Sequence, residues 1–133
     1  MAHAITFRSA RFDVAAERPN PINPIPGEGV LRWLREKLAG HRYETTEPAP
    51  EDWGWYIEVT GDGAAYLVGA SGDAVEESPG DVDWTIQVHR HRSLRDKLTG
   101  RNKLTAADPV SSLIERLLLE DRGMRGVAVE REP

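Results

Sequence analysis

Apolar and polar residues alternate along three stretches in the middle of the chain, and this alternation predicts β-strands. The stretches are WGWYIEVT (53–60), AAYLVGA (64–70) and VDWTIQVHRHR (82–92). A period of two residues is typical of antiparallel strands with one buried face. The sequence GDG at 61–63 indicates a hairpin turn between the first two stretches, because glycine tolerates the positive φ of such turns. The polar residues 71–81 are expected to form the following loop.

Two other stretches repeat their apolar residues at helical spacing. The first, GVLRWLREKLAG (29–40), places Trp33 at the edge of its apolar stripe. The second follows Asp108 and Pro109, which are favoured residues at the N-cap and the first helical position. A short helix is predicted between them, capped by Ser93 and ended by Gly100.

The order of these elements predicts an α+β fold. A strand is expected over 5–14, with a bulge or bend near Ser9, and a last strand is expected in MRGVAVE (124–130). Residues 18–29 hold four Pro and two Gly and are interpreted as an extended connector. The predicted order is β-α-β-β-β-α-α-β. A central three-stranded antiparallel meander, joined by the N- and C-terminal strands, would pack two main helices on one face. A chain of 133 residues is typical of a single domain, here 1–133.

Composition excludes several classes of chemistry. The chain has no cysteine, which removes disulfides, thiolate metal sites and thiol catalysis. Its N-terminus lacks an apolar run of signal-peptide length, and nowhere do 18 apolar residues occur together. We therefore expect a cytoplasmic protein with no membrane partner.

Charge is segregated along the chain. The net charge is −5, but residues 43–88 contain eleven acids and no Lys or Arg, whereas residues 89–103 carry +5. Such blocks often mark an interaction surface. The alternative is that the acids lie in solvated loops and the bases on a solvated helix.

One candidate surface combines aromatic and acidic residues. It comprises Glu51, Asp52, Trp53, Trp55, Tyr56 and Glu58. An exposed Trp is a natural anchor for a protein partner, and neighbouring carboxylates favour a basic partner. The alternative is that Trp53 and Trp55 lie with Trp84 on the buried face of the sheet.

The second candidate is the basic cluster. It comprises Arg90, Arg92, Arg95, Lys97, Arg101 and Lys103. Arginine forks and lysines hold phosphate or carboxylate groups. Nucleic acid fits less well, because the rest of the chain is acidic and few aromatic residues accompany the cations. Arg90 and Arg92 continue the apolar face of their strand, so we expect the core to end at Val88.

His89 and His91 are the third candidate, since residues two apart on a strand share a face. A metal site requires further ligands, which the neighbouring sequence does not offer. Acid–base catalysis requires a carboxylate near a histidine, and no catalytic motif accompanies either one. No catalytic residue, metal or cofactor is predicted.

These patterns favour a non-enzymatic protein-interaction module. It would be an inhibitor or neutralising protein whose acidic face meets a basic partner, and self-association through the basic patch is a variant of the same idea. The alternative is a binder of a phosphate-bearing ligand or nucleic acid through residues 89–103. A hydrolase or isomerase using His89 or His91 is the third hypothesis.

Overall fold

The computed structural model describes residues 2–131, and within this range the chain forms one seven-stranded antiparallel sheet. The strand order is β2-β4-β5-β6-β1-β7, with β3 also paired to β4. The strands are β1 (His3–Ser9), β2 (Glu44–Thr45), β3 (Ala49–Glu51), β4 (Gly54–Gly61), β5 (Ala64–Ala74), β6 (Val82–Arg90) and β7 (Arg125–Arg131). The helices are α1 (Glu28–Ala39), α2 (Leu94–Thr99) and α3 (Pro109–Glu120), with a 3₁₀ turn η1 at Val14–Ala16. The α+β fold is confirmed.

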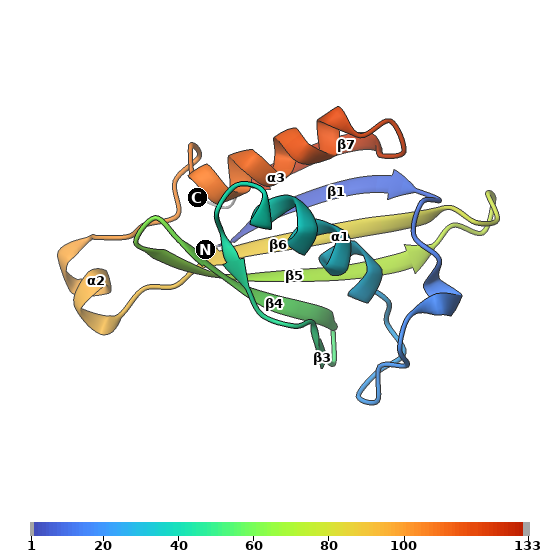
Figure 1. Ribbon diagram of the computed structural model, residues 1–133, viewed down its shortest axis with the longest axis horizontal. Coiled ribbons are helices and arrows are strands. Elements are labelled where there is room, and N and C mark those ends of the chain that lie inside the picture. Colours follow the sequence, from blue (N-terminus) through green and yellow to red (C-terminus); the bar gives the residue numbers. More distant parts are fainter. Residues whose placement is uncertain (1, 132–133) are drawn as a thin grey trace.

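The two long helices, α1 and α3, lie over the same face of the sheet (Figure 1). Their apolar stripes and the alternate residues of the strands form one hydrophobic cluster, as the periodicity predicts. Ile5, Trp84 and Leu34 are essentially inaccessible to solvent and represent the contributions of β1, β6 and α1. Trp33 also belongs to this core, where Phe12 packs edge-on against its ring. The opposite face of the sheet, here called the open face, has no helix over it in the described residues.

Local sequence signals set the turns and helix starts. Asp62 and Gly63 connect β4 to β5 with φ values of 52° and 76°, which confirms the predicted hairpin. Ser93 and Asp96 form a capping box at α2. Asp108 is the N-cap of α3, and Pro109 is its first residue. Because these signals depend only on neighbouring residues, they could be predicted without knowledge of the tertiary structure.

Several strand boundaries differ from the prediction. β1 ends at Ser9, the predicted bend, and the chain then enters η1 instead of continuing as a strand to Val14. β5 extends to Ala74, into the predicted loop, because it pairs with β6 from Tyr66 to Ala74. The short strands β2 and β3 were not predicted, and both form by pairing with β4.

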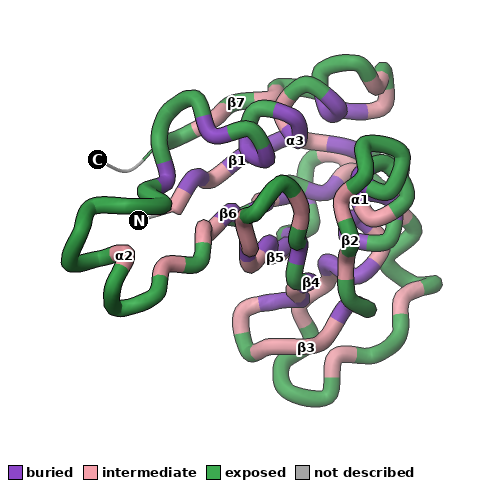
Figure 2. Tube along the Cα trace, turned by 60° about the vertical axis from the view of Figure 1, so that its left-hand side comes forward, coloured by how far each residue is buried: buried purple, intermediate pink, exposed green. Residues whose placement is uncertain are grey.

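The β4–β5 turn and α2 lie at one end of the sheet, and the β5–β6 loop lies at the other (Figure 1). No residue of α2 is buried, and the segment around it is largely exposed (Figure 2). The cations of α2, Arg95 and Lys97, therefore lie beyond the end of the core.

Candidate interaction surface

The open face is built from the side chains that alternate with the core. Its exposed or half-buried residues include Ala4, Thr6, Tyr56, Glu58, Leu67, Thr85, Gln87 and His89, together with the ion-paired Arg8 and Asp83. Strand register places Tyr56, Gly69 and Gln87 in one cross-strand row. Glu58, Leu67 and His89 form the next row. The centre of this face is thus flat, with an aromatic and an aliphatic side chain close together.

The indole of Trp53 lies on this face, over Gly69. A Cβ atom built on Gly69 would be 2.4 Å from Cη2 and 2.5 Å from Cζ3 of Trp53. The missing side chain of Gly69 therefore creates the seat for the ring. Because Trp53 remains half-exposed, its outer surface is available to a partner.

The turn that carries Trp53 is tied to the Pro-rich connector. Asn20 Nδ2 donates to the carbonyl oxygens of Glu51 and Gly54, at 3.0 and 2.9 Å. Asn23 Nδ2 donates to the carbonyl oxygen of Asp52 at 2.8 Å. The connector predicted over 18–29 thus braces the β3–β4 turn, a role that its proline content alone does not reveal.

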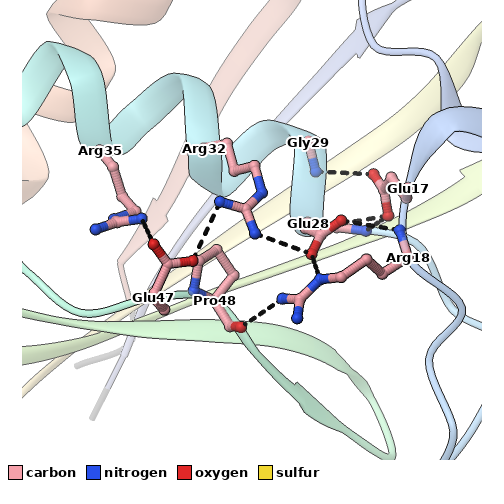
Figure 3. A network of polar contacts seen from close by, with 9 residues as sticks. Glu17, Arg18, Glu28, Gly29, Arg32, Arg35, Glu47 and Pro48 are labelled. Atoms are coloured by element: carbon pink, nitrogen blue, oxygen red, sulfur yellow. Dashed lines mark hydrogen bonds and ion pairs between the residues drawn. The ribbon is translucent and has the colours of Figure 1, made fainter.

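A network of charged groups fixes the other side of the connector (Figure 3). Glu28, at the start of α1, accepts hydrogen bonds from the backbone N–H and the guanidinium of Arg18 and from Arg32. Arg18 also donates to the carbonyl oxygen of Pro48, just before β3. Burial alone raises the pKa of Glu28, but the hydrogen bonds from Arg18 outweigh it and hold that pKa below its usual value.

Three carboxylates on β3, on β4 and on the turn between them have no basic partner among the described residues. Glu51 ends β3, Asp52 lies on the turn, and Glu58 lies on the open face beside Leu67. Among the described residues, none of these three forms an ion pair, whereas Glu47, Asp81 and Asp83 are neutralised by arginines. The aromatic centre therefore has an acidic rim whose charge is not compensated within the chain.

Trp55 has to be removed from the candidate surface. Its side chain is 2% exposed and lies in the core. The expectation that Trp53 shares the buried face with Trp55 is also wrong. Asp52 and Trp53 form a turn, so strand alternation begins only at Gly54, and the two indoles lie on opposite faces.

The acidic segment as a whole does not form one patch. Asp62 lies at the β4–β5 turn, whereas Glu76 and Glu77 lie in the β5–β6 loop at the far end of the sheet. The eleven-residue strand β5 separates them. Only the part near Trp53 combines acidic and aromatic groups.

The residues of the basic cluster also differ in their surroundings. Arg90 donates to Asp108 and Asn102, at 3.1 and 3.0 Å, and its guanidinium lies over the Tyr66 ring. The core thus does not end at Val88, because the stem of Arg90 continues along its edge. Arg92 donates to the backbone carbonyls of Arg101 and Asp96.

The structure contains a buried polar group that the sequence did not indicate. His3 Nδ1 lies 2.7 Å from Ser111 Oγ, and both residues are 2% exposed. Asp108 lies three residues before Ser111, but its carboxylate accepts hydrogen bonds from Tyr66, from Arg90 and from two backbone N–H groups at the start of α3. This combination of Ser, His and Asp is therefore a structural network without solvent access.

His89 and His91, the third candidate, lie in different surroundings. His89 lies on the open face, and His91 lines a depression of about 610 Å³ with Glu44 and Asp96. No hydrogen bond joins the His91 imidazole to a carboxylate within residues 2–131, and Asp96 is engaged in the α2 capping box. The same residues contain no cluster of three or more potential metal ligands.

No helix in the described part of the chain is long and apolar enough to cross a membrane. Comparison of the sequence with protein-family models and with curated proteins, and of the chain with solved structures, gave no match.

Proposed function

We propose that this protein is a non-enzymatic interaction module that binds a basic protein through the open face of its sheet. The observation that carries the proposal is the half-exposed Trp53 ring, seated over Gly69 beside Tyr56, on a turn whose flanking strands carry carboxylates without ion pairs among the described residues. Trp and Tyr supply a large share of interface energy at the centre of a contact. Acidic groups at the rim accelerate encounter with a cationic surface.

The position of these groups on a sheet face supports a neutralising or inhibitory role. A broad sheet face with an acidic rim covers a basic functional site by contact alone and needs no chemistry of its own. The braced β3–β4 turn supports this role, because Asn20 and Asn23 hold the Trp53 segment in place before binding.

Quantitative capture from cells that naturally make the protein tests the proposal. The bait is compared with Trp53→Ala and with the triple variant Glu51→Gln, Asp52→Asn, Glu58→Gln. The matched control is Glu36→Gln, Glu76→Gln, Glu77→Gln, which removes the same charge from exposed residues of α1 and the β5–β6 loop.

We expect Trp53→Ala to weaken binding by roughly 30-fold or more, the effect of a central aromatic anchor. The first triple variant should slow association and reduce its salt dependence, because rim charges act chiefly on the encounter rate. The control triple should bind like the natural protein. Equal capture of the same basic protein by all four baits would remove the open face as the binding surface.

A further inference from the structure

The cations of the basic cluster gather around a cleft between the end of β6 and the segment that follows α2. The cleft has a volume of about 540 Å³. Its charged and titratable lining residues are His89, Arg90, His91, Arg92, Lys97 and Lys103. Leu104 and Thr105 complete the lining, which contains no carboxylate-bearing residue.

Most of the positive charge in this cleft is uncompensated. Arg90 is paired with Asp108, but Arg92 is held by two backbone carbonyl oxygens. Within the described residues, Arg92, Lys97 and Lys103 form no ion pair with a carboxylate. Asp96, the acid on α2, accepts a hydrogen bond from the N–H of Ser93, and the charge of Arg92 helps to lower its pKa, so the lysines carry the charge that is not compensated.

The two arginines are fixed before any ligand arrives. Hydrogen bonds orient Arg90 toward Asp108 and Asn102, and Arg92 is held by the carbonyls of Asp96 and Arg101. Preorganised cations lose little conformational freedom on binding an anion. The two lysines at the edge of the cleft supply mobile charges that adjust to it.

We propose that this cleft binds a compact anion carrying two or more linked phosphate groups. Several converging cations suit an oligophosphate better than a single carboxylate, because each phosphate offers several oxygens and more charge. A second depression that His91 also lines contains Glu44 and Asp96 beside Arg42, and these carboxylates would repel the phosphates of an extended nucleic acid. The proposal goes beyond the protein-binding role and does not rest on it.

The test is calorimetric titration of the full chain with pyrophosphate and tripolyphosphate at constant ionic strength, alongside orthophosphate and a 12-nucleotide single-stranded DNA. The variant is Lys97→Ala with Lys103→Ala. The matched control is Arg95→Ala with Arg101→Ala, which removes the same charge from the same segment but from residues that do not line the cleft.

We expect tripolyphosphate to bind more tightly than orthophosphate. The lysine double variant should weaken tripolyphosphate binding at least tenfold. The arginine control should change its affinity by less than about twofold. Absence of measurable tripolyphosphate binding, or equal weakening by both double variants, would overturn the proposal. Tighter binding of the DNA, lost in both variants, would also overturn it and assign the segment to nucleic acid. Thermal melting of each variant verifies that it is folded.

Discussion

At the scale of single residues, two glycines on β5 have opposite roles. Gly69 faces the open side and leaves room for the half-exposed Trp53 ring. Gly72 faces the core, where a Cβ would lie 2.6 Å from the Trp84 ring and 2.8 Å from Val82. The Trp84 side chain is 1% exposed and cannot move aside. The same chemical change is therefore expected to have different consequences at the two positions.

Gly72→Ala should reduce the free energy of unfolding by about 1–3 kcal/mol, as overpacking of a tight core does. Gly69→Ala should change it by less than about 1 kcal/mol, because Trp53 can swing into solvent and alanine is better tolerated than glycine within a strand. Urea denaturation of both variants measures the difference. Equal destabilisation would mean that the Trp53 ring is fixed in place on the open face. Gly69→Ala in a Trp53→Ala background serves as the control.

His3 gives the stability of the protein a specific pH dependence. Burial lowers its pKa, nearby Arg131 lowers it further, and Asp108 opposes these effects. The unfolded chain therefore binds a proton near pH 6.5 that the folded chain does not bind until lower pH. Stability should fall as the pH decreases below about 6.5, until the folded pKa is reached.

Urea denaturation of the natural protein and of His3→Gln at pH 7.5 and 5.5 isolates this contribution. We expect a smaller loss of stability in the variant over this interval. The carboxyl groups with lowered pKa values, including Glu28 and Asp83, act in a separate window below about pH 4.5. An identical pH response in the two proteins would exclude His3 as the titrating group.

Residue-scale prediction from sequence succeeded where the pattern was regular and failed where a turn intervened. Ile57 and Val59 are buried as the alternation predicts. Trp53 has the same parity but lies in a turn, and Gly54 beside it has a φ of 146°. Alternation along the sequence predicts which face a side chain occupies only while the backbone remains extended.

At the scale of elements, hydrogen bonds at the start of α1 hold the Pro-rich connector in place. Glu17 accepts hydrogen bonds from the backbone N–H groups of Gly27, Glu28 and Gly29. Carboxylates are favoured at this end of a helix because the helix dipole is positive there. The adjacent Glu28 then links α1 to Arg18 and, through it, to the segment before β3.

Two glutamates of this network provide a matched pair, since each contacts two arginines. Glu28→Ala should lower the free energy of unfolding by about 1.5–3 kcal/mol, because it removes a buried charged acceptor with several donors. Glu47→Ala should cost far less, as expected of an exposed ion pair. The Glu28 and Glu47 side chains are 5% and 69% exposed, respectively. Chemical denaturation measures the loss of unfolding free energy in both variants. A larger loss for Glu47→Ala would contradict the role given to Glu28 at the start of α1.

Elements with local signals were predicted, and those that depend on a partner strand were not. Ser93, Asp108 and Pro109 mark their helices because caps act within a few residues. β3 contains Pro50, which is compatible only with an edge position, and the strand exists because β4 lies beside it. Gly72 and Asp73 resemble loop residues in the sequence, yet both pair with β6.

At the scale of the whole molecule, strand order decides how the charge pattern is displayed. β1 inserts between β6 and β7, so that Ile5 pairs with both Ile86 and Val129. Such long-range pairing cannot be inferred from the composition of the strands. The sequence indicated that acidic and basic segments are distinct. The structure adds that the acidic segment reaches both ends of the sheet, with the cationic cleft at only one of them.

Photo-crosslinking from the open face tests the central claim most directly. A benzoylphenylalanine is placed at Gln87, an exposed residue in the same row as Gly69, and in a second protein at Leu119, which is 63% exposed on α3. Both proteins are irradiated in cells that naturally make this chain, and the adducts are identified by mass spectrometry. We expect a specific adduct with a basic protein from position 87, sensitive to salt and absent from position 119. An adduct with that protein from position 119, with none from position 87, would show that the partner binds the helical face instead.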